Sequence, residues 1–379
     1  MALPQLGYLR ELKTKLFAEV TEVPAILQGS YYPSLDGLRG IAIIMVIIYH
    51  FGANHFFRPF HFLFNGELGV NIFFVISGFL ITTLLLKENI KYGKVSFKRF
   101  YTRRALRIIP VAYLFLMVMI VLNSIFKLGL TTSNFLSAGL FYKNVPFQSD
   151  DYTGHFWSLA TEIQFYLIAP YILISNVNRY CVLALSIVML TLILSLLGFY
   201  CPGFLHSNPI VYRVTQVCMY FFWNGPFAVF IGSLFAIFLF KGVISIKKGS
   251  SNYVLSFLLL LIILTISNKL SLLYYKYISE FIAAILTGWI IVLCLKGRSL
   301  LSGTLESRVL VRIGIISYSL YIWQELFIGT RTFPVWVQPF HSYPLWLFIT
   351  LKLLCVFVIA FTSHYLFESK FLRIKKRYE

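Results

Sequence analysis

Two ionisable residues, Arg39 and His50, lie eleven positions apart in the segment 35–51, whose other side chains are mostly aliphatic. On an α-helix this spacing completes about three turns and rises about 16 Å, so both side chains lie on one face at two depths. An ionisable group within a membrane span is costly and normally faces the bundle interior or a water-filled cavity. Histidine exchanges a proton near neutral pH, so His50 is a candidate general base; a structural histidine at the membrane interface is the alternative.

A second polar patch lies in the string HFWSLATEIQFYLIAP, residues 155–170. Ser158 and Glu162 are four positions apart, so a helix places them on one face, with Glu162 about two turns below the outer membrane surface. We expect His50 to reach a similar depth. A carboxylate beside a histidine holds its tautomer and stabilises its protonated form, so Glu162 is predicted to orient His50. A structural ion pair or a hydrogen bond between helices is the alternative for Glu162.

A basic cluster occurs in residues 87–110, which read KENIKYGKVSFKRFYTRRALRIIP. A helix leading into Pro110 would present Arg103, Arg104 and Arg107 together, because they are three and four positions apart. The planar guanidinium groups of such a cluster suit phosphate. The alternative is positive-inside topology with lipid headgroup contacts, which explains the lysines better than the clustered arginines.

A run of small and polar residues marks the string GVNIFFVISGF, residues 69–79. Gly69, Ser77 and Gly78 permit close helix approach, and packing alone would explain them. Asn71 is different, because an amide within a span needs a hydrogen-bond partner or a substrate.

The composition excludes an ordinary soluble domain. The chain has 379 residues and is 59% hydrophobic, 18% aromatic and only 12% charged, with a mean hydropathy of +0.79. We therefore predict an all-α polytopic integral membrane protein. The net charge of +19 is assigned to membrane topology and anionic lipid rather than to nucleic acid.

About ten membrane spans are expected from hydropathy. Most of the 33 Lys and Arg fall on one side of these spans, which predicts that both termini are cytoplasmic. The ninth span brings Gln324 and Glu325 toward the outer side. The approximate limits are 37–55, 68–87, 108–126, 156–174, 181–199, 223–240, 252–268, 278–296, 313–330 and 345–367.

One integral membrane domain is expected to fill most of the chain, at residues 31–369. Residues 1–30 are predicted to form an amphipathic cytoplasmic segment and residues 370–379 a basic cytoplasmic tail. The sequence predicts no further soluble domain after the last span. Cys201 and Cys218 could form a disulfide in an outer loop, although buried free thiols are an equal alternative.

Four strings in order resemble the acyltransferase 3 family of integral membrane acyltransferases. They are the Arg-x10-His string, the GVxxFFVxSGF string, the FYxRRxxRxxP string and the WSLxxExxFY string. The resemblance is dense over residues 35–169 and thinner through FAVFIGSLFA (227–236) and SYSLYIWQ (317–324). One string alone would be a weak signal, but four in order are specific.

The resemblance implies an O-acyltransferase of the stand-alone type, without a fused esterase-like domain. It would move an acyl group, usually acetyl from coenzyme A, to a hydroxyl of an extracytoplasmic glycan or lipid-linked sugar, in the bacterial cytoplasmic (inner) membrane. No metal is expected, and a separate periplasmic partner could complete the transfer. By motif matching, the catalytic residues are His50 and Glu162, the acyl-CoA-binding residues are Arg39, Arg104 and Arg107, and further active-site candidates are Asp36, Asn71, Ser77 and Ser158.

The expected mechanism follows from the two depths of the polar residues. The phosphates of acyl-CoA would dock at the inner arginines, and the pantetheine arm would run along the face shared by Arg39 and His50. His50 would deprotonate the acceptor hydroxyl as it attacks the thioester. An acyl-histidine intermediate is the alternative route.

Three positions depart from the family pattern. Asn71 stands where many members have Asp, Ile163 replaces a second Glu, and Gln324 replaces a frequent His. An additional acid–base role is therefore doubtful at these positions. The alternative functions are a secondary transporter or flippase, which also carries polar groups on its spans, and a receptor or scaffold.

Overall fold

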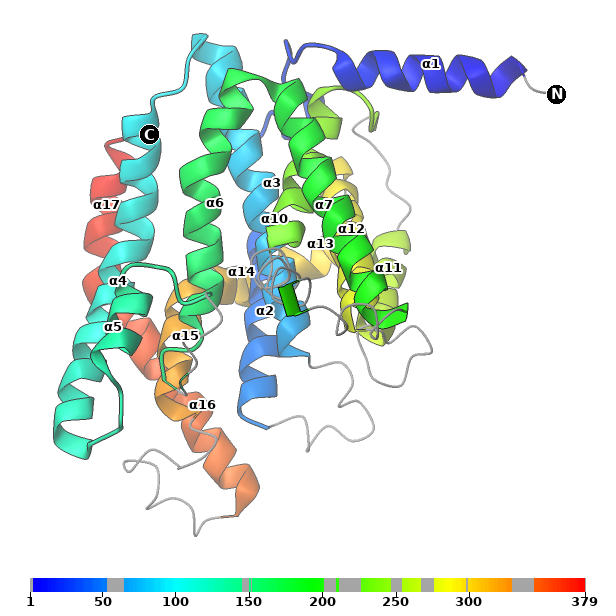
Figure 1. Cartoon of the computed structure of the whole chain (residues 1–379). Helices are drawn as coiled ribbons and strands as arrows, with labels where there is room; N and C mark the ends of the chain where they lie inside the picture. The colour runs from blue at the N-terminus through cyan, green and yellow to red at the C-terminus, as the bar shows by residue number, and fades with distance from the viewer. Residues whose placement is uncertain are drawn as a thin grey trace. The chain divides into compact units, whose positions relative to one another are not determined.

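The computed structural model describes residues 3–52, 65–144, 150, 152–200, 209–210, 226–246, 254–266, 276–297, 299–328 and 344–378. Within these residues every regular element is a helix, and none is a strand (Figure 1). The all-α prediction is therefore confirmed. An apolar chain favours this class because an α-helix satisfies its backbone hydrogen bonds within one segment.

Seven helices in the described ranges are long and apolar enough to cross a membrane. Two further apolar helices, α10 (Pro226–Phe240) and α11 (Leu255–Ile266), are shorter. The protein is thus an integral membrane protein, while the count of about ten spans and the cytoplasmic position of both termini stay predictions. The seven are α2 (Pro33–His50), α3 (Gly66–Tyr92), α4 (Phe97–Phe126), α6 (Phe156–Ser175), α7 (Val177–Tyr200), α12 (Lys276–Lys296) and α16 (Leu345–Thr362).

The predicted span at 313–330 is not one continuous helix. It consists of the end of α14 (Arg308–Ile315), then α15 (Ser317–Trp323) and the 3₁₀ turn η4 (Gln324–Phe327). Ile316 separates the first two helices with φ −90° and ψ 5°, outside the α-helical range. Hydropathy alone does not register such a break, because the apolar side chains continue through it.

Tertiary contacts divide the chain into two compact units that alternate along the sequence. The first unit comprises Met1–Leu35, Asn71–Val95 and Gln164–Ser307, and the second comprises Asp36–Val70, Ser96–Ile163 and Arg308–Glu379.

The second unit is built around α4. This helix packs against α5 (Thr132–Gly139), against α15, and against η6 (Ser363–Glu368) and α17 (Ser369–Lys376), which follow α16 without a break. Figure 1 shows α17 running alongside α4. The element η6 is a π-helical turn, a rare form that occurs frequently at functional sites.

Glycines let helices of the second unit touch backbone to backbone. A Cβ atom at Gly40 of α2 would lie 2.4 Å from the Leu310 carbonyl oxygen of α14. A Cβ atom at Gly314 would lie 1.8 Å from the Asp36 carbonyl oxygen. The segment that carries Arg39 is thereby fixed against α14.

The first unit packs α10 against α7 and α12, and α11 against α12 and α13 (Leu300–Leu305). A Cβ atom at Gly78 would lie 1.9 Å from the Val229 carbonyl oxygen, and one at Gly232 would lie 2.0 Å from the Val75 carbonyl oxygen. The expected close helix approach at Gly78 is therefore confirmed. At Gly69, in the second unit, a Cβ atom would lie 2.6 Å from the Ala42 carbonyl oxygen, which confirms close packing there too.

The terminal segments are helical in their described parts. The segment 1–30 contains α1 (Leu3–Phe17) and the 3₁₀ turn η1 (Ala25–Leu27), and the segment 370–379 lies largely in α17. Their cytoplasmic location stays a prediction. Cys201 and Cys218 lie outside the described residues.

Candidate active site

The second unit contains most of the residues that the sequence singled out. Asn71 and Ser77 belong to the first unit and are described with it. The seven candidates of the second unit are Asp36, Arg39, His50, Arg104, Arg107, Ser158 and Glu162.

His50 is the last residue of α2, and the Gln324 side chain approaches it closely enough to interact. Gln324 is fully buried and begins the η4 turn. Within the described ranges, neither amide atom of Gln324 nor the Nδ1 atom of His50 has a hydrogen-bond partner at regular geometry. Three polar atoms from two distant segments thus lie near one another with unused hydrogen-bonding capacity.

His155 adds a second histidine to this cluster, and the sequence reasoning missed it. It immediately precedes α6, it is 4% exposed, and it lies near enough to His50 for electrostatic interaction. Its ring packs edge-on against Phe115 and Phe156, with centroids 5.2 Å and 4.8 Å away. Burial lowers the pKa of His155 to about 3, so its imidazole is neutral.

Glu325 lies beside His155 and is also buried. Its Oε1 atom is 3.7 Å from the Nδ1 atom of His155, which exceeds hydrogen-bonding distance. Neither ring nitrogen of His155 has a hydrogen-bond partner among the residues that the structure describes. A signal for His155 was present in the sequence, since it is the first residue of the string HFWSLATEIQFYLIAP, but its proximity to His50 depends on helix packing.

A row of polar side chains follows one face of α15 and η4 at three-residue spacing: Tyr318, Tyr321 and Gln324. The Tyr321 hydroxyl lies 2.6 Å from the Ser158 hydroxyl. Each of these hydroxyls is also within hydrogen-bonding distance of the His155 carbonyl oxygen, at 3.2 Å and 3.0 Å. Ser158 is therefore tied to α15 and to the residue before α6.

Glu162 interacts electrostatically with Tyr318 and Tyr321. The Tyr318 hydroxyl donates a hydrogen bond of 2.8 Å to the Ile108 carbonyl oxygen, and Arg107 is another electrostatic neighbour of Tyr318. Glu162 is thus placed along the α15 row, between the level of Arg107 and the level of Ser158. Its pairing with His50 stays a prediction.

The arginines lie on α2 and α4. Arg39 is 3.7 Å from the Asp36 carboxylate, one helical turn away. The Arg104 guanidinium lies over the Phe100 ring at 5.9 Å, and Arg103 donates a hydrogen bond of 2.8 Å to the Tyr378 carbonyl oxygen. Helix α4 begins at Phe97 with the Ser96 side chain as its N-cap and continues through Pro110 rather than starting after it.

Asn71 and Ser77 are hydrogen-bonded within the first unit. The Asn71 amide nitrogen donates to the Glu280 carbonyl oxygen at 3.1 Å, and the Ser77 hydroxyl lies 2.6 Å from the Tyr166 hydroxyl. These contacts join α3 to α12 and to α6. They agree with the interpretation that Ser77 serves helix packing.

A charged network holds the segment that leads into His155. Lys143 and Asp150 form an ion pair, and Asn134 and Thr153 donate hydrogen bonds to the same carboxylate at 2.9 Å and 2.6 Å. Burial alone would raise the pKa of Asp150, but the hydrogen bonds from Lys143 and Thr153 lower it overall. The ionised Asp150 therefore fixes the backbone on the amino-terminal side of α6.

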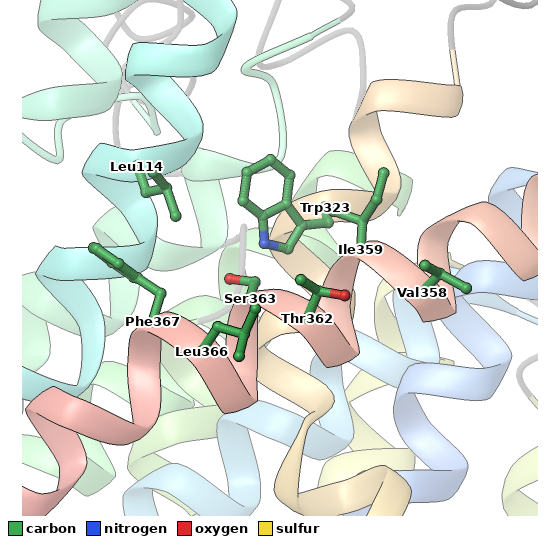
Figure 2. Close-up of a pocket in the computed structure, with 8 residues that line it drawn as sticks. All are labelled: Leu114, Trp323, Val358, Ile359, Thr362, Ser363, Leu366 and Phe367. Atoms are coloured by element: carbon green, nitrogen blue, oxygen red, sulfur yellow. The ribbon is translucent and has the colours of Figure 1, made fainter.

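An apolar groove of about 330 Å³ is lined by side chains of α4, α15, α16 and η6 (Figure 2). Its hydroxyl groups come from Thr362 and Ser363, and the indole nitrogen of Trp323 points toward them. The groove suits hydrocarbon better than a charged donor such as coenzyme A. The lining residues are Leu114, Trp323, Val358, Ile359, Thr362, Ser363, Leu366 and Phe367.

Comparison with known proteins agrees with the family that the four sequence strings and the apolar helices suggest. A family model described as an acyltransferase domain matches residues 32–365. The chain therefore belongs to the acyltransferase 3 family of membrane proteins.

Among its relatives is the O-acetyltransferase OatA of Staphylococcus aureus. The proteins of strain NCTC 8325 / PS 47 and strain COL are each 32% identical to this chain over 313 residues. The match covers 77% of this chain and 50% of the relatives, so the chain spans about half the length of the curated relatives that it matches. No solved structure matches.

Proposed function

We propose that this protein is a membrane O-acyltransferase that moves an acetyl group from cytosolic acetyl-CoA to a hydroxyl of an extracytoplasmic glycan. The observation that carries the proposal is the proximity of His50 to the buried side chains of His155 and Gln324, in a chain of the acyltransferase 3 family. The printed name of the relatives, O-acetyltransferase, supports acetyl as the group and a hydroxyl as the acceptor. The acceptor class is a surface polysaccharide, such as a lipopolysaccharide O-antigen, or a lipid-linked sugar.

Acyl-CoA binding is assigned to Arg39, Arg104 and Arg107. Coenzyme A carries several phosphates, and guanidinium groups bind phosphate with charge-assisted hydrogen bonds. Arg104 and Arg107 are one turn apart on α4, and both belong to the same unit as the His50 cluster. Asp36 lies within an ion-pair distance of Arg39 and would hold its guanidinium in place.

The transfer step uses His50 as general base. The imidazole takes the proton of the acceptor hydroxyl while that oxygen attacks the thioester carbonyl, and it then protonates the departing thiolate. The carboxylate of Glu162 stabilises the positive charge that develops along this path. Ser158 contributes through its hydroxyl contact with Tyr321. Asn71 and Ser77 are assigned to helix packing within the first unit rather than to chemistry.

The location follows from the reaction. A donor made in the cytosol and an acceptor outside require a protein in the bacterial cytoplasmic (inner) membrane, with membrane lipids around it. A separate periplasmic partner would receive or position the glycan if the acceptor is a polymer.

The test is acetyl transfer by the purified full-length chain in liposomes, with radiolabelled acetyl-CoA and a lipid-linked sugar acceptor. The wild type is expected to release free coenzyme A and to label the acceptor. His50→Ala is expected to lower the rate at least about 100-fold, because general-base catalysis contributes about 10²–10⁴-fold. Cys355→Ala, a change at an exposed free cysteine, is the control for folding and insertion. Absence of acetyl-CoA cleavage and binding in the wild type, with uptake of the sugar instead, would favour a transporter or flippase.

A further inference from the structure

The Gln324 amide is fully buried, and its side chain approaches His50 without forming a hydrogen bond of regular geometry. Its exposure is 0%, and both its Oε1 and its Nε2 atoms lack hydrogen-bond partners within the described ranges. Leaving a buried polar atom unsatisfied costs about 1–3 kcal/mol, so such groups are rare outside functional sites. The amide is therefore best understood as a group whose partner arrives with substrate.

The position of Gln324 is fixed by its backbone. It ends α15 and begins η4, and its N–H donates to the Leu320 carbonyl oxygen as the helix cap. The next residue toward the amino terminus, Trp323, lines the apolar groove (Figure 2), while the Gln324 side chain approaches His50. A short capped turn thus holds the amide beside the candidate base.

The surroundings of Gln324 also indicate what kind of group its amide would bind. His155 is buried and neutral, and the Nδ1 atom of His50 is unpartnered within the described residues. Buried surroundings of low dielectric strengthen any hydrogen bond to an anion that forms within them. An amide does not titrate, so its N–H remains available as a donor at every pH at which His50 is a base.

We infer that Gln324 is a catalytic residue that donates a hydrogen bond from Nε2 to the acyl carbonyl oxygen and stabilises the oxyanion of the tetrahedral intermediate. This inference rests on the proposed acyl transfer. The acceptor oxygen forms a bond to the thioester carbon, the carbonyl electron pair moves to oxygen, and His50 takes the hydroxyl proton. The intermediate then collapses, the carbon–sulfur bond breaks, and the coenzyme A thiolate receives the proton from His50.

The alternative role for Gln324 is to orient His50 by a direct hydrogen bond. The two roles predict opposite results for Gln324→Glu, which keeps the size of the side chain. A carboxylate would accept a hydrogen bond from the imidazole and support a base, whereas it would repel an oxyanion and remove the donor. Gln324→Met keeps the unbranched length and removes both polar atoms.

The experiment measures kcat and KM for acetyl-CoA in liposome-reconstituted wild type, Gln324→Met and Gln324→Glu, with Gln28→Met as the matched control at an exposed glutamine. We expect both Gln324 variants to lose about 10²–10³-fold in kcat, as for removal of one oxyanion donor, with KM nearly unchanged. In Gln324→Met, which introduces no charge, the pH dependence of kcat should keep its wild-type midpoint. Gln28→Met should match the wild type.

A second measurement uses two acetyl-CoA analogues in which a methylene group replaces the sulfur: a methyl ketone and a trifluoromethyl ketone, which hydrates to a tetrahedral species. The wild type should bind the tetrahedral analogue more tightly, and Gln324→Met should lose that preference while still binding the methyl ketone. In Gln324→Met, an unchanged kcat, a retained preference for the tetrahedral analogue or a shifted pH midpoint would overturn the role of Gln324 while leaving acyl transfer intact. Failure of the wild type to cleave acetyl-CoA would instead overturn the proposed function.

Discussion

Arg104 and Arg107, which we propose to bind the phosphates of the acyl donor, lie on α4 in the second unit. Arg104 and Arg107 share one helix face, and Arg107 interacts with the α15 row through Tyr318. The row continues through Tyr321 to Gln324, which lies beside His50, the proposed base. A long, thin donor such as acyl-pantetheine matches this arrangement.

Arg104→Ala and Arg107→Ala are each expected to weaken acetyl-CoA binding by about 1.5–3 kcal/mol, because each removes a charge-assisted contact. This corresponds to a roughly 10- to 150-fold higher Kd. Binding of acetyl-pantetheine, which lacks the nucleotide, should change far less. Isothermal titration of the detergent-solubilised protein gives both constants.

Arg99→Ala is the matched control, because Arg99 is exposed and lies on the same helix. Equal weakening of both donors in the Arg104 and Arg107 variants would assign these arginines to structure. Weakening by Arg99→Ala of the same size would point to a general surface charge effect.

At the scale of residues, the sequence predicts best what lies on one helix. The spacing of Arg39 and His50 on α2, and of Ser158 and Glu162 on α6, follows from helix geometry alone. His155 was not selected, and Gln324 was noted without a catalytic role, because their proximity to His50 joins three segments far apart in the chain. Helical periodicity relates residues within a segment, whereas packing decides which segments meet.

At the scale of elements, glycines determine how closely helices approach. In the first unit, Gly78 of α3 and Gly232 of α10 face each other's neighbouring backbone, with room for hydrogen only. Such contacts suit membrane helices, whose association depends on close packing rather than on exclusion of water.

Gly232→Ala is expected to destabilise the first unit by about 1–3 kcal/mol, because the added methyl group must displace the Val75 backbone. Thermal unfolding of the protein in detergent should show a lower Tm. Gly303→Ala is the control, since it lies in helix α13 where an added Cβ meets no atom within 4 Å. That change should leave Tm equal or raise it, because alanine favours a helix by about 0.5–1 kcal/mol. Equal Tm shifts in the two variants would contradict the packing argument.

Helices were predictable from the sequence where an apolar segment was long and uninterrupted. The seven long helices coincide with predicted spans, and the limits differ mainly where polar helix ends extend a span, as in α4. The segment 308–328 was not predictable, because its breaks depend on local backbone geometry. Gly314 packs against the Asp36 backbone, and the chain leaves helical geometry at Ile316.

At the scale of the whole molecule, the number of crossings fixes the sides of the termini. Seven crossings would place the ends on opposite sides of the membrane. Ten crossings, with α10, α11 and the broken segment 308–328 included, place both ends on one side, as the positive-inside rule predicts.

Short epitope tags at the two ends are expected to be cleaved by protease in inside-out vesicles and protected in right-side-out vesicles. A tag inserted after Asn144, in a predicted outer loop, should show the reverse pattern and serves as the control. Opposite protection of the two end tags would contradict the even number of crossings.

During synthesis, the second unit is completed only by the last fifth of the chain, Arg308–Glu379. About 270 residues separate His50 from Gln324, which at about 5–20 residues per second takes a ribosome roughly 15 to 55 s. Helices α2 and α6 enter the membrane in that interval, while Tyr321, Gln324 and Glu325 do not yet exist. His50 and His155 must then be accommodated by water, lipid headgroups or the insertion machinery. The polar cluster closes only when α15 and η4 arrive, so quality control of this protein has its longest opportunity late in translation.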